Sequence, residues 1–219
     1  NLLKNSGVES FDQRAKLADE HTVELADGTK KTAKHILVAT GGWPSMPDIK
    51  GAELGISSNE IFHLDKLPEN ILIVGGGYIA CEFACILAGL GMQVTQYYRG
   101  AQILRGFDDE ARGHVSDAMC ENGINLHLGT NILEMKRSDD GKGVWVKSTN
   151  GAEQVFDQVL FATGRSPSSA NMGLEDAGVA LGRGKEIVVD AYSQTSVPSI
   201  YAIGDVTNRI NLTPVAIRE

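Results

Sequence analysis

The sequence of 219 residues contains only three cysteines, Cys81, Cys85 and Cys120, and no Cys-x-x-Cys motif. Three cysteines do not form the disulfide framework of a secreted domain, so a reducing, cytoplasmic location is expected. The five histidines show no metal-ligand spacing among themselves or with the cysteines. The sequence therefore predicts neither structural disulfides nor a metal centre.

Basic residues and long apolar segments are also scarce. Lys and Arg number 20 against 28 Asp and Glu, giving a net charge of −8, which argues against a nucleic-acid surface. The longest apolar stretch, residues 71–94, carries one charge, Glu82, and is split by three consecutive glycines. Its helical part would be about 20 Å long against a hydrocarbon core of about 30 Å, so no membrane span is predicted.

Glycine is abundant instead, at 25 residues, which suits tight turns and nucleotide-binding loops. Strands and helices alternate in the central part of the chain, which predicts βαβ units, a largely parallel sheet and an α/β fold. The expected strands are 71–74, 93–98 and 124–128, and the expected helices are 78–90 and 109–121. Residues 132–138 and 143–148 are expected to form a hairpin, residues 21–26 and 35–39 to be strands flanking an Asp27-Gly28 turn, and residues 44–70 to connect the two regions.

A near repeat indicates how the chain is organised. HILVATGG (35–42) and QVLFATGR (158–165) are each an expected strand followed by Ala-Thr-Gly. We interpret them as one crossing point used twice, so that residues 43–164 form a domain inserted between residues 1–42 and 165–219. Chance recurrence of a short turn motif is the alternative.

The segment Gly75-Gly76-Gly77-Tyr78-Ile79-Ala80 fits G-x-G-x-x-G/A and follows an expected strand. Gly75 allows the tight turn, Gly77 lets the backbone approach a pyrophosphate, and Ala80 lets the helix pack close to the sheet. The anion would lie on the free N–H groups at the helix N-terminus. The segment predicts a Rossmann-like dinucleotide site.

The next strand end indicates which dinucleotide. An NAD-selective site places Asp or Glu there, but Val94-Thr95-Gln96-Tyr97-Tyr98 contains no acid and is followed by Arg99 and Arg105. Guanidinium groups suit a 2′-phosphate, so NADPH is the expected cofactor. The alternative is that both are solvated loop arginines.

These residues resemble the glutathione reductases, which belong to the flavin-dependent pyridine nucleotide–disulfide oxidoreductases. The resemblance is carried by GGGYIACEFA, YYRGAQILRGFDDEAR, FATGRSP and SQTSVPSIYAIGDVTNRINLTPVAIRE and spans essentially the whole chain. It implies NADPH-dependent reduction of glutathione disulfide through FAD in a homodimeric parent. It also implies an NADP-binding domain at 43–164, between two parts of an incomplete FAD-binding domain.

The resemblance assigns roles to single residues. Arg99 and Arg105 would grip the 2′-phosphate, Tyr78 would gate the nicotinamide pocket, and Glu82 would lie near the nicotinamide amide. The NADP set is completed by Gly75, Gly76, Gly77, Ile79 and Gly164. The expected FAD contacts are Ala15, Thr40, Gly41, Asp205 and Thr213. The alternatives are a half-exposed helix-start residue for Tyr78 and a capping or turn aspartate for Asp205.

Parts of the family pattern do not occur in this sequence. There is no second G-x-G-x-x-G and no Cys-x4-Cys, because Cys81 and Cys85 are only four residues apart. The chain begins with Asn1 and ends within an expected helix, so it is expected to be the middle of a longer enzyme. A non-catalytic nucleotide-binding module is the alternative of a different class. Trypanothione reductase is the alternative enzyme, and dihydrolipoamide dehydrogenase is disfavoured by the missing acid.

Overall fold

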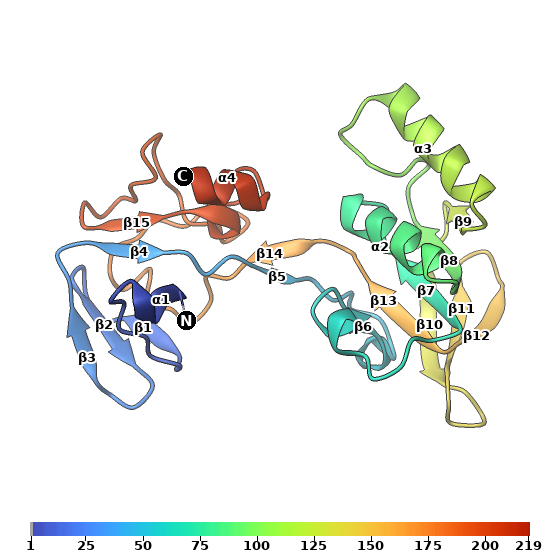
Figure 1. The fold of residues 1–219 in the computed structure, drawn as a ribbon, viewed down its shortest axis with the longest axis horizontal. Coiled ribbons are helices and arrows are strands. Elements are labelled where there is room, and N and C mark those ends of the chain that lie inside the picture. The colour runs from blue at the N-terminus through green and yellow to red at the C-terminus, as the bar shows by residue number, and fades with distance from the viewer. Residues whose placement is uncertain (1) are drawn as a thin grey trace. The chain divides into compact units, whose positions relative to one another are not determined.

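The computed structural model describes residues 2–219, which form two compact units. Unit 1 comprises the described residues up to Trp43 together with Ser166–Glu219, and unit 2 comprises Pro44–Arg165. The chain passes between the units at β5 (Gly42–Pro44) and β14 (Arg165–Pro167), which pair as a two-stranded sheet (Figure 1).

Unit 2 is built on a parallel sheet of five strands in the order β6-β13-β7-β8-β9. Its strands are β6 (Ile56–Ser57), β7 (Asn70–Val74), β8 (Gln93–Tyr98), β9 (Asn125–Leu128) and β13 (Gln158–Phe161). Its helices are α2 (Tyr78–Gly89) and α3 (Asp109–Glu121), with short 3-10 helices η1 (Ala52–Leu54) and η2 (Glu60–His63). The predicted α/β class and the predicted strand–helix alternation are confirmed.

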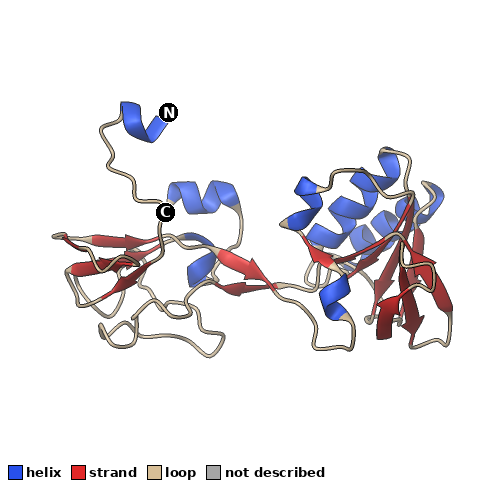
Figure 2. Ribbon diagram, turned by 90° about the horizontal axis from the view of Figure 1, so that it is seen from below, coloured by secondary structure: helices blue, strands red, loops and turns tan. Residues whose placement is uncertain are grey.

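The two faces of the parallel sheet are buried by different elements. Ile71 and Ile73 of β7 pack in one cluster with residues of α2 and α3, whereas Leu72 and Val74 pack in a second cluster on the opposite face. The second cluster includes residues of an antiparallel sheet, formed by β10 (Ile132–Arg137), β11 (Val144–Ser148) and β12 (Glu153–Phe156). Figure 2 shows the two long helices of unit 2 lying together on one side of its strands. Burial on both faces explains why β7 is apolar from Ile71 to Val74.

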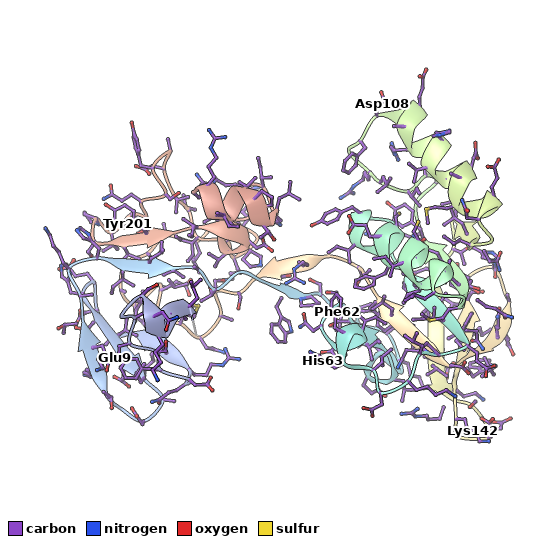
Figure 3. The ribbon with its side chains drawn as sticks, viewed as in Figure 1. Glu9, Phe62, His63, Asp108, Lys142 and Tyr201 are labelled. Carbon is purple, nitrogen blue, oxygen red and sulfur yellow. The ribbon has the colours of Figure 1, made fainter. Side chains whose placement is uncertain are left out.

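Local sequence signals determine where the two helices of unit 2 lie. Ala80 and Ala84 of α2 are fully buried, and their small side chains let the helix lie close to β7 and β8. Asp108, labelled in Figure 3, caps α3 by accepting hydrogen bonds from the N–H groups of Glu110 and Ala111. The helix ends at Glu121 with Asn122 as its C-cap, and the following Gly123 adopts a φ of 83°.

Unit 1 contains two small sheets. Strands β1 (Ala15–Leu17), β2 (Thr22–Leu25) and β3 (Lys30–Thr32) form an antiparallel sheet, and β4 (Ile36–Val38) pairs in parallel with β15 (Ile200–Ala202). Its helical elements are α1 (Leu2–Asn5), η3 (Gly204–Thr207) and α4 (Thr213–Arg218). The core of unit 1 gathers Val38, Ile200 and Ala202 with residues of the segment that precedes β15, such as Leu174 and Ile187.

Three local predictions need correction. The strand that pairs with β2 across the Asp27-Gly28 turn is β3, not residues 35–39, which form β4 in a different sheet. β3 was missed because all three of its residues are exposed and polar, so it carries no apolar alternation. Residues 44–70 also hold structure beyond a connector, namely β6, η1 and η2, and the hairpin of β10 and β11 gains β12 as a third strand.

Among residues 2–219, no helix has the length and apolar content of a membrane span. Within the same residues, no three His, Cys, Asp or Glu side chains are grouped in a way that could hold a metal ion.

Candidate functional site

Three segments expected to bind a dinucleotide follow the carboxyl ends of neighbouring parallel strands. β7 lies between β13 and β8 in the sheet, and all three run in the same direction. The glycine loop (Gly75–Gly77) follows β7, Arg99 follows β8, and Gly164 comes three residues after β13. The topology therefore brings these segments to one edge of the sheet, where α/β proteins bind ligands (Figure 1).

The three glycines of the glycine loop have different surroundings. Gly75 adopts a φ of 142°, and a Cβ added there would lie 2.2 Å from the Ala162 carbonyl oxygen. A Cβ at Gly76 would lie 2.4 Å from the ring of Tyr98. Gly77 is exposed, and a Cβ there would meet nothing within 4 Å. The fold therefore needs the first two glycines, whereas the third leaves open space at the start of α2.

The N-terminus of α2 carries no capping side chain. Gly77 occupies the N-cap position with extended backbone, and no side-chain hydrogen bond caps the helix. Among residues 2–219, no side chain therefore occupies the start of α2, which is the kind of helix terminus that binds an anion. Tyr78 at the first helical position is 38% exposed, Ile79 is half-buried, and Glu82 one turn later is exposed. Within residues 2–219, the Glu82 carboxylate makes no hydrogen bond or ion pair.

The arginine loop, residues 99–107, runs from the end of β8 toward α3. Arg99 and Arg105 in this loop are both exposed. In the part of the chain that the structure describes, neither guanidinium makes a hydrogen bond or an ion pair. Two arginines without partners among residues 2–219 thus follow the end of β8, which lies next to the strand that leads into the glycine loop. A pair of guanidinium groups placed in this way is suited to binding a phosphate.

One buried polar residue of the site was not predicted. Gln96 of β8 is fully buried, and its Nε2 donates to the Gly75 carbonyl over 2.9 Å. Nε2 also lies 3.8 Å from the Cys81 sulfur, and Oε1 has no partner among residues 2–219. The side chain of Gln96 on β8 thus holds the backbone of Gly75, the first residue of the glycine loop. The sequence pattern for cofactor selection concerns an acid or an arginine at the end of β8, and it gives no role to a glutamine within that strand.

The three cysteines do not form a redox pair, and Cys81 alone among them packs in the core. Cys81 is buried against the core, and this burial raises the pKa of its thiol even though Gln96 donates a hydrogen bond to it. Cys85 and Cys120 are exposed, and all three thiols are free. A thiol with a raised pKa is a poor nucleophile at neutral pH.

Most residues expected to contact FAD lie near one edge of the small parallel sheet of unit 1. Thr40 and Gly41 follow β4, and Asp205 follows its neighbour β15. Helix α4, which begins at Thr213, packs on the turn that holds Asp205, since the Gly204 N–H donates to the Glu219 carboxylate over 2.8 Å. Ala15 differs, because it lies on β1 in the antiparallel sheet.

Comparisons with known proteins agree with this architecture. The family model for pyridine nucleotide-disulphide oxidoreductase matches residues 1–219. A glutathione reductase of Burkholderia cepacia is 48% identical over 218 residues, covering 100% of this chain and 48% of that protein. A trypanothione reductase of Leishmania donovani is 47% identical over 189 residues, covering 85% of this chain and 38% of that protein.

A solved structure shares the fold over nearly the whole chain. The HOCl-induced flavoprotein disulfide reductase RclA from Escherichia coli matches with a TM-score of 0.89 and 26% identity, covering 96% of this chain and 48% of that chain. The chain therefore spans about half the length of these proteins, or less.

Proposed function

The chain belongs to the pyridine nucleotide-disulphide oxidoreductase family, and we propose that unit 2 binds NADPH as part of a glutathione reductase-like flavoprotein. One observation carries this proposal. The open glycine loop at the uncapped start of α2 and the unpaired Arg99 follow adjacent parallel strands. The glycine loop at the start of α2 suits a pyrophosphate, and Arg99 suits the 2′-phosphate that distinguishes NADPH from NADH.

Several residues of unit 2 have the surroundings that this cofactor would need. Gly77 leaves room for a close backbone approach, and the N–H groups of α2 would hold the pyrophosphate. Arg99 and Arg105 would bind the 2′-phosphate. Tyr78, Glu82 and Gly164 are the proposed neighbours of the nicotinamide end. When bound, NADPH supplies a hydride, and the protein contributes its position and surroundings.

The proposal extends to FAD and to the substrate through the family. Thr40, Gly41, Asp205 and Thr213 would contribute to a flavin site, which in this family relays electrons to a disulfide. Glutathione disulfide is the proposed substrate of the parent protein, because the B. cepacia relative is a glutathione reductase. A homodimer is its proposed form, as the family resemblance implies. Trypanothione reductase activity is the second candidate, supported by the 47% identity to the L. donovani protein.

A direct test is to titrate the 219-residue chain with NADPH and with NADH, following cofactor fluorescence. Two charged hydrogen bonds to the 2′-phosphate, at roughly 1.5–3 kcal/mol each, predict an NADPH preference of at least about 100-fold. High salt should weaken NADPH binding more than NADH binding, because it screens the exposed arginines. Equal affinity for the two cofactors would contradict the proposed site.

A second measurement distinguishes the reductase from a nucleotide-binding module without turnover. The sequence contains no Cys-x4-Cys, and its buried thiol, Cys81, has a raised pKa. We therefore expect the chain tested alone to retain no flavin after purification and to show no NADPH oxidation with glutathione disulfide. The few exposed flavin contacts of unit 1 contribute about 0.5–1.5 kcal/mol each, against roughly 4–15 kcal/mol of lost rigid-body freedom. A flavin absorption band or turnover above background would contradict this expectation.

A further inference from the structure

The arginine loop is hydrogen-bonded directly to the glycine loop. The Leu104 N–H donates to the Gly76 carbonyl over 2.6 Å, and Leu104 adopts a φ of 55°. A leucine holds this left-handed conformation only where its surroundings impose it. Its neighbour Ile103 is fully buried in the core beside α2. The middle of the arginine loop is therefore anchored, although Arg99 and Arg105 at either side of the anchor are exposed.

Tyr98 provides a second connection between the two loops. A Cβ at Gly76 would lie 2.4 Å from its ring, and a Cβ at Gly100 would lie 2.6 Å from the same ring. The aromatic ring thus packs against the backbone of both loops, and Gly100 is required for packing next to Arg99.

A third arginine in the same region uses its donors on the protein backbone. The Arg112 Nε donates to the Ile103 carbonyl over 2.7 Å, and Nη2 donates to the Gln102 carbonyl over 3.1 Å. Nη1 pairs with the Asp109 carboxylate on the same helix. The Arg112 side chain is only 15% exposed, whereas that of Asp109 is 85% exposed. One guanidinium on α3 therefore spans two consecutive carbonyl groups of the arginine loop.

We propose that Arg112 is a positioning residue for cofactor selection. By holding the carbonyl groups of Gln102 and Ile103, it fixes the backbone between Arg99 and Arg105 and so sets the separation of the two positions from which their side chains extend. Neither guanidinium has a partner of its own in residues 2–219, so the loop backbone is what places the two side chains relative to each other before binding. A site fixed before binding loses less entropy when it takes up the 2′-phosphate. The inference rests on the proposed NADPH site.

The test compares Arg112→Met with the unchanged 219-residue chain in NADPH and NADH titrations. We expect NADPH affinity to fall about 10-fold, as for the loss of one charged hydrogen bond. NADH affinity should change less than about twofold, because NADH lacks the 2′-phosphate that the loop would bind. Arg112→Lys keeps the charge but cannot span two carbonyl groups, and it should lower the NADPH preference to an intermediate value. The matched control is Asp109→Asn, which removes the ion pair on α3, leaves both carbonyl contacts and should keep the preference.

The outcomes separate this inference from the proposed function. An Arg112→Met chain that keeps the original NADPH preference, or that loses NADPH and NADH affinity equally, would overturn the positioning role. Thermal melting shows whether each variant is folded. If Arg112→Met does not fold, the NADPH preference of Arg112→Lys is used instead, and an unchanged preference or an equal loss of NADPH and NADH affinity would again overturn the positioning role. If the unchanged chain shows no NADPH preference, the proposed site itself fails and the role of Arg112 fails with it.

Discussion

Replacing Arg99 and Arg105 together with glutamine is expected to weaken NADPH binding at least about 100-fold and to leave NADH binding nearly unchanged. Each arginine contributes roughly 1.5–3 kcal/mol if it makes a charged hydrogen bond to the 2′-phosphate, and about 1.4 kcal/mol corresponds to a tenfold change in affinity. Both side chains are exposed and make no contact that the fold requires among residues 2–219. The melting temperature should therefore remain within a few degrees of that of the unchanged chain.

The chain offers a control that removes the same charge elsewhere in unit 2. Arg137 at the end of β10 and Lys142 in the following turn are both exposed, and Figure 3 labels Lys142. The double variant Arg137→Gln/Lys142→Gln should bind both cofactors normally, because these charges lie in the antiparallel sheet and its turn. Equal losses of NADPH and NADH affinity in the Arg99/Arg105 variant would rule out a specific 2′-phosphate contact.

The elements around the site were predictable because local signals there agree with one another. An apolar strand, a glycine run and a helix containing Ala80 predicted β7, the glycine loop and α2, and the expected helix at 109–121 corresponds to α3. The parallel order of the strands then brings Arg99 to the same edge as Gly75. In contrast, β3 gives no apolar signal, because Lys30-Lys31-Thr32 is exposed throughout.

The residues that hold the site together were not predictable from local pattern. Gln96 contacts the Gly75 carbonyl, 21 residues away in sequence, and only the pairing of β8 beside β7 explains why a glutamine is buried there. Arg112 resembles any other helical arginine in the sequence, yet its guanidinium binds carbonyl groups nine and ten residues earlier. Such contacts depend on how a loop folds back on a helix, which neither periodicity nor motif spacing encodes.

Alanine substitutions in the glycine loop are expected to separate a glycine that the fold needs from one that the ligand needs. At Gly75 the methyl group would lie 2.2 Å from a backbone oxygen, that of Ala162, and alanine would also have to adopt a φ of 142°. Neither strain can be relieved by moving a flexible side chain. Gly75→Ala should therefore lower the free energy of unfolding by about 3 kcal/mol or more, visible as a lower midpoint in urea.

At Gly77 the same substitution meets open space. The backbone there has a φ of −81° and a ψ of 175°, which alanine adopts freely, and no atom lies within 4 Å of the added methyl group. Stability should stay within about 0.5 kcal/mol of the unchanged chain, as for most surface substitutions.

If the pyrophosphate lies on Gly77, however, the methyl group of Gly77→Ala occupies the space that the ligand needs. NADPH and NADH affinity should then fall together, at least about 10-fold, because both cofactors carry the pyrophosphate. This parallel loss differs from the NADPH-specific loss expected for the arginines, so the two sets of variants distinguish the two ends of the proposed site. A Gly77→Ala chain that binds both cofactors with unchanged affinity would place the pyrophosphate away from the start of α2.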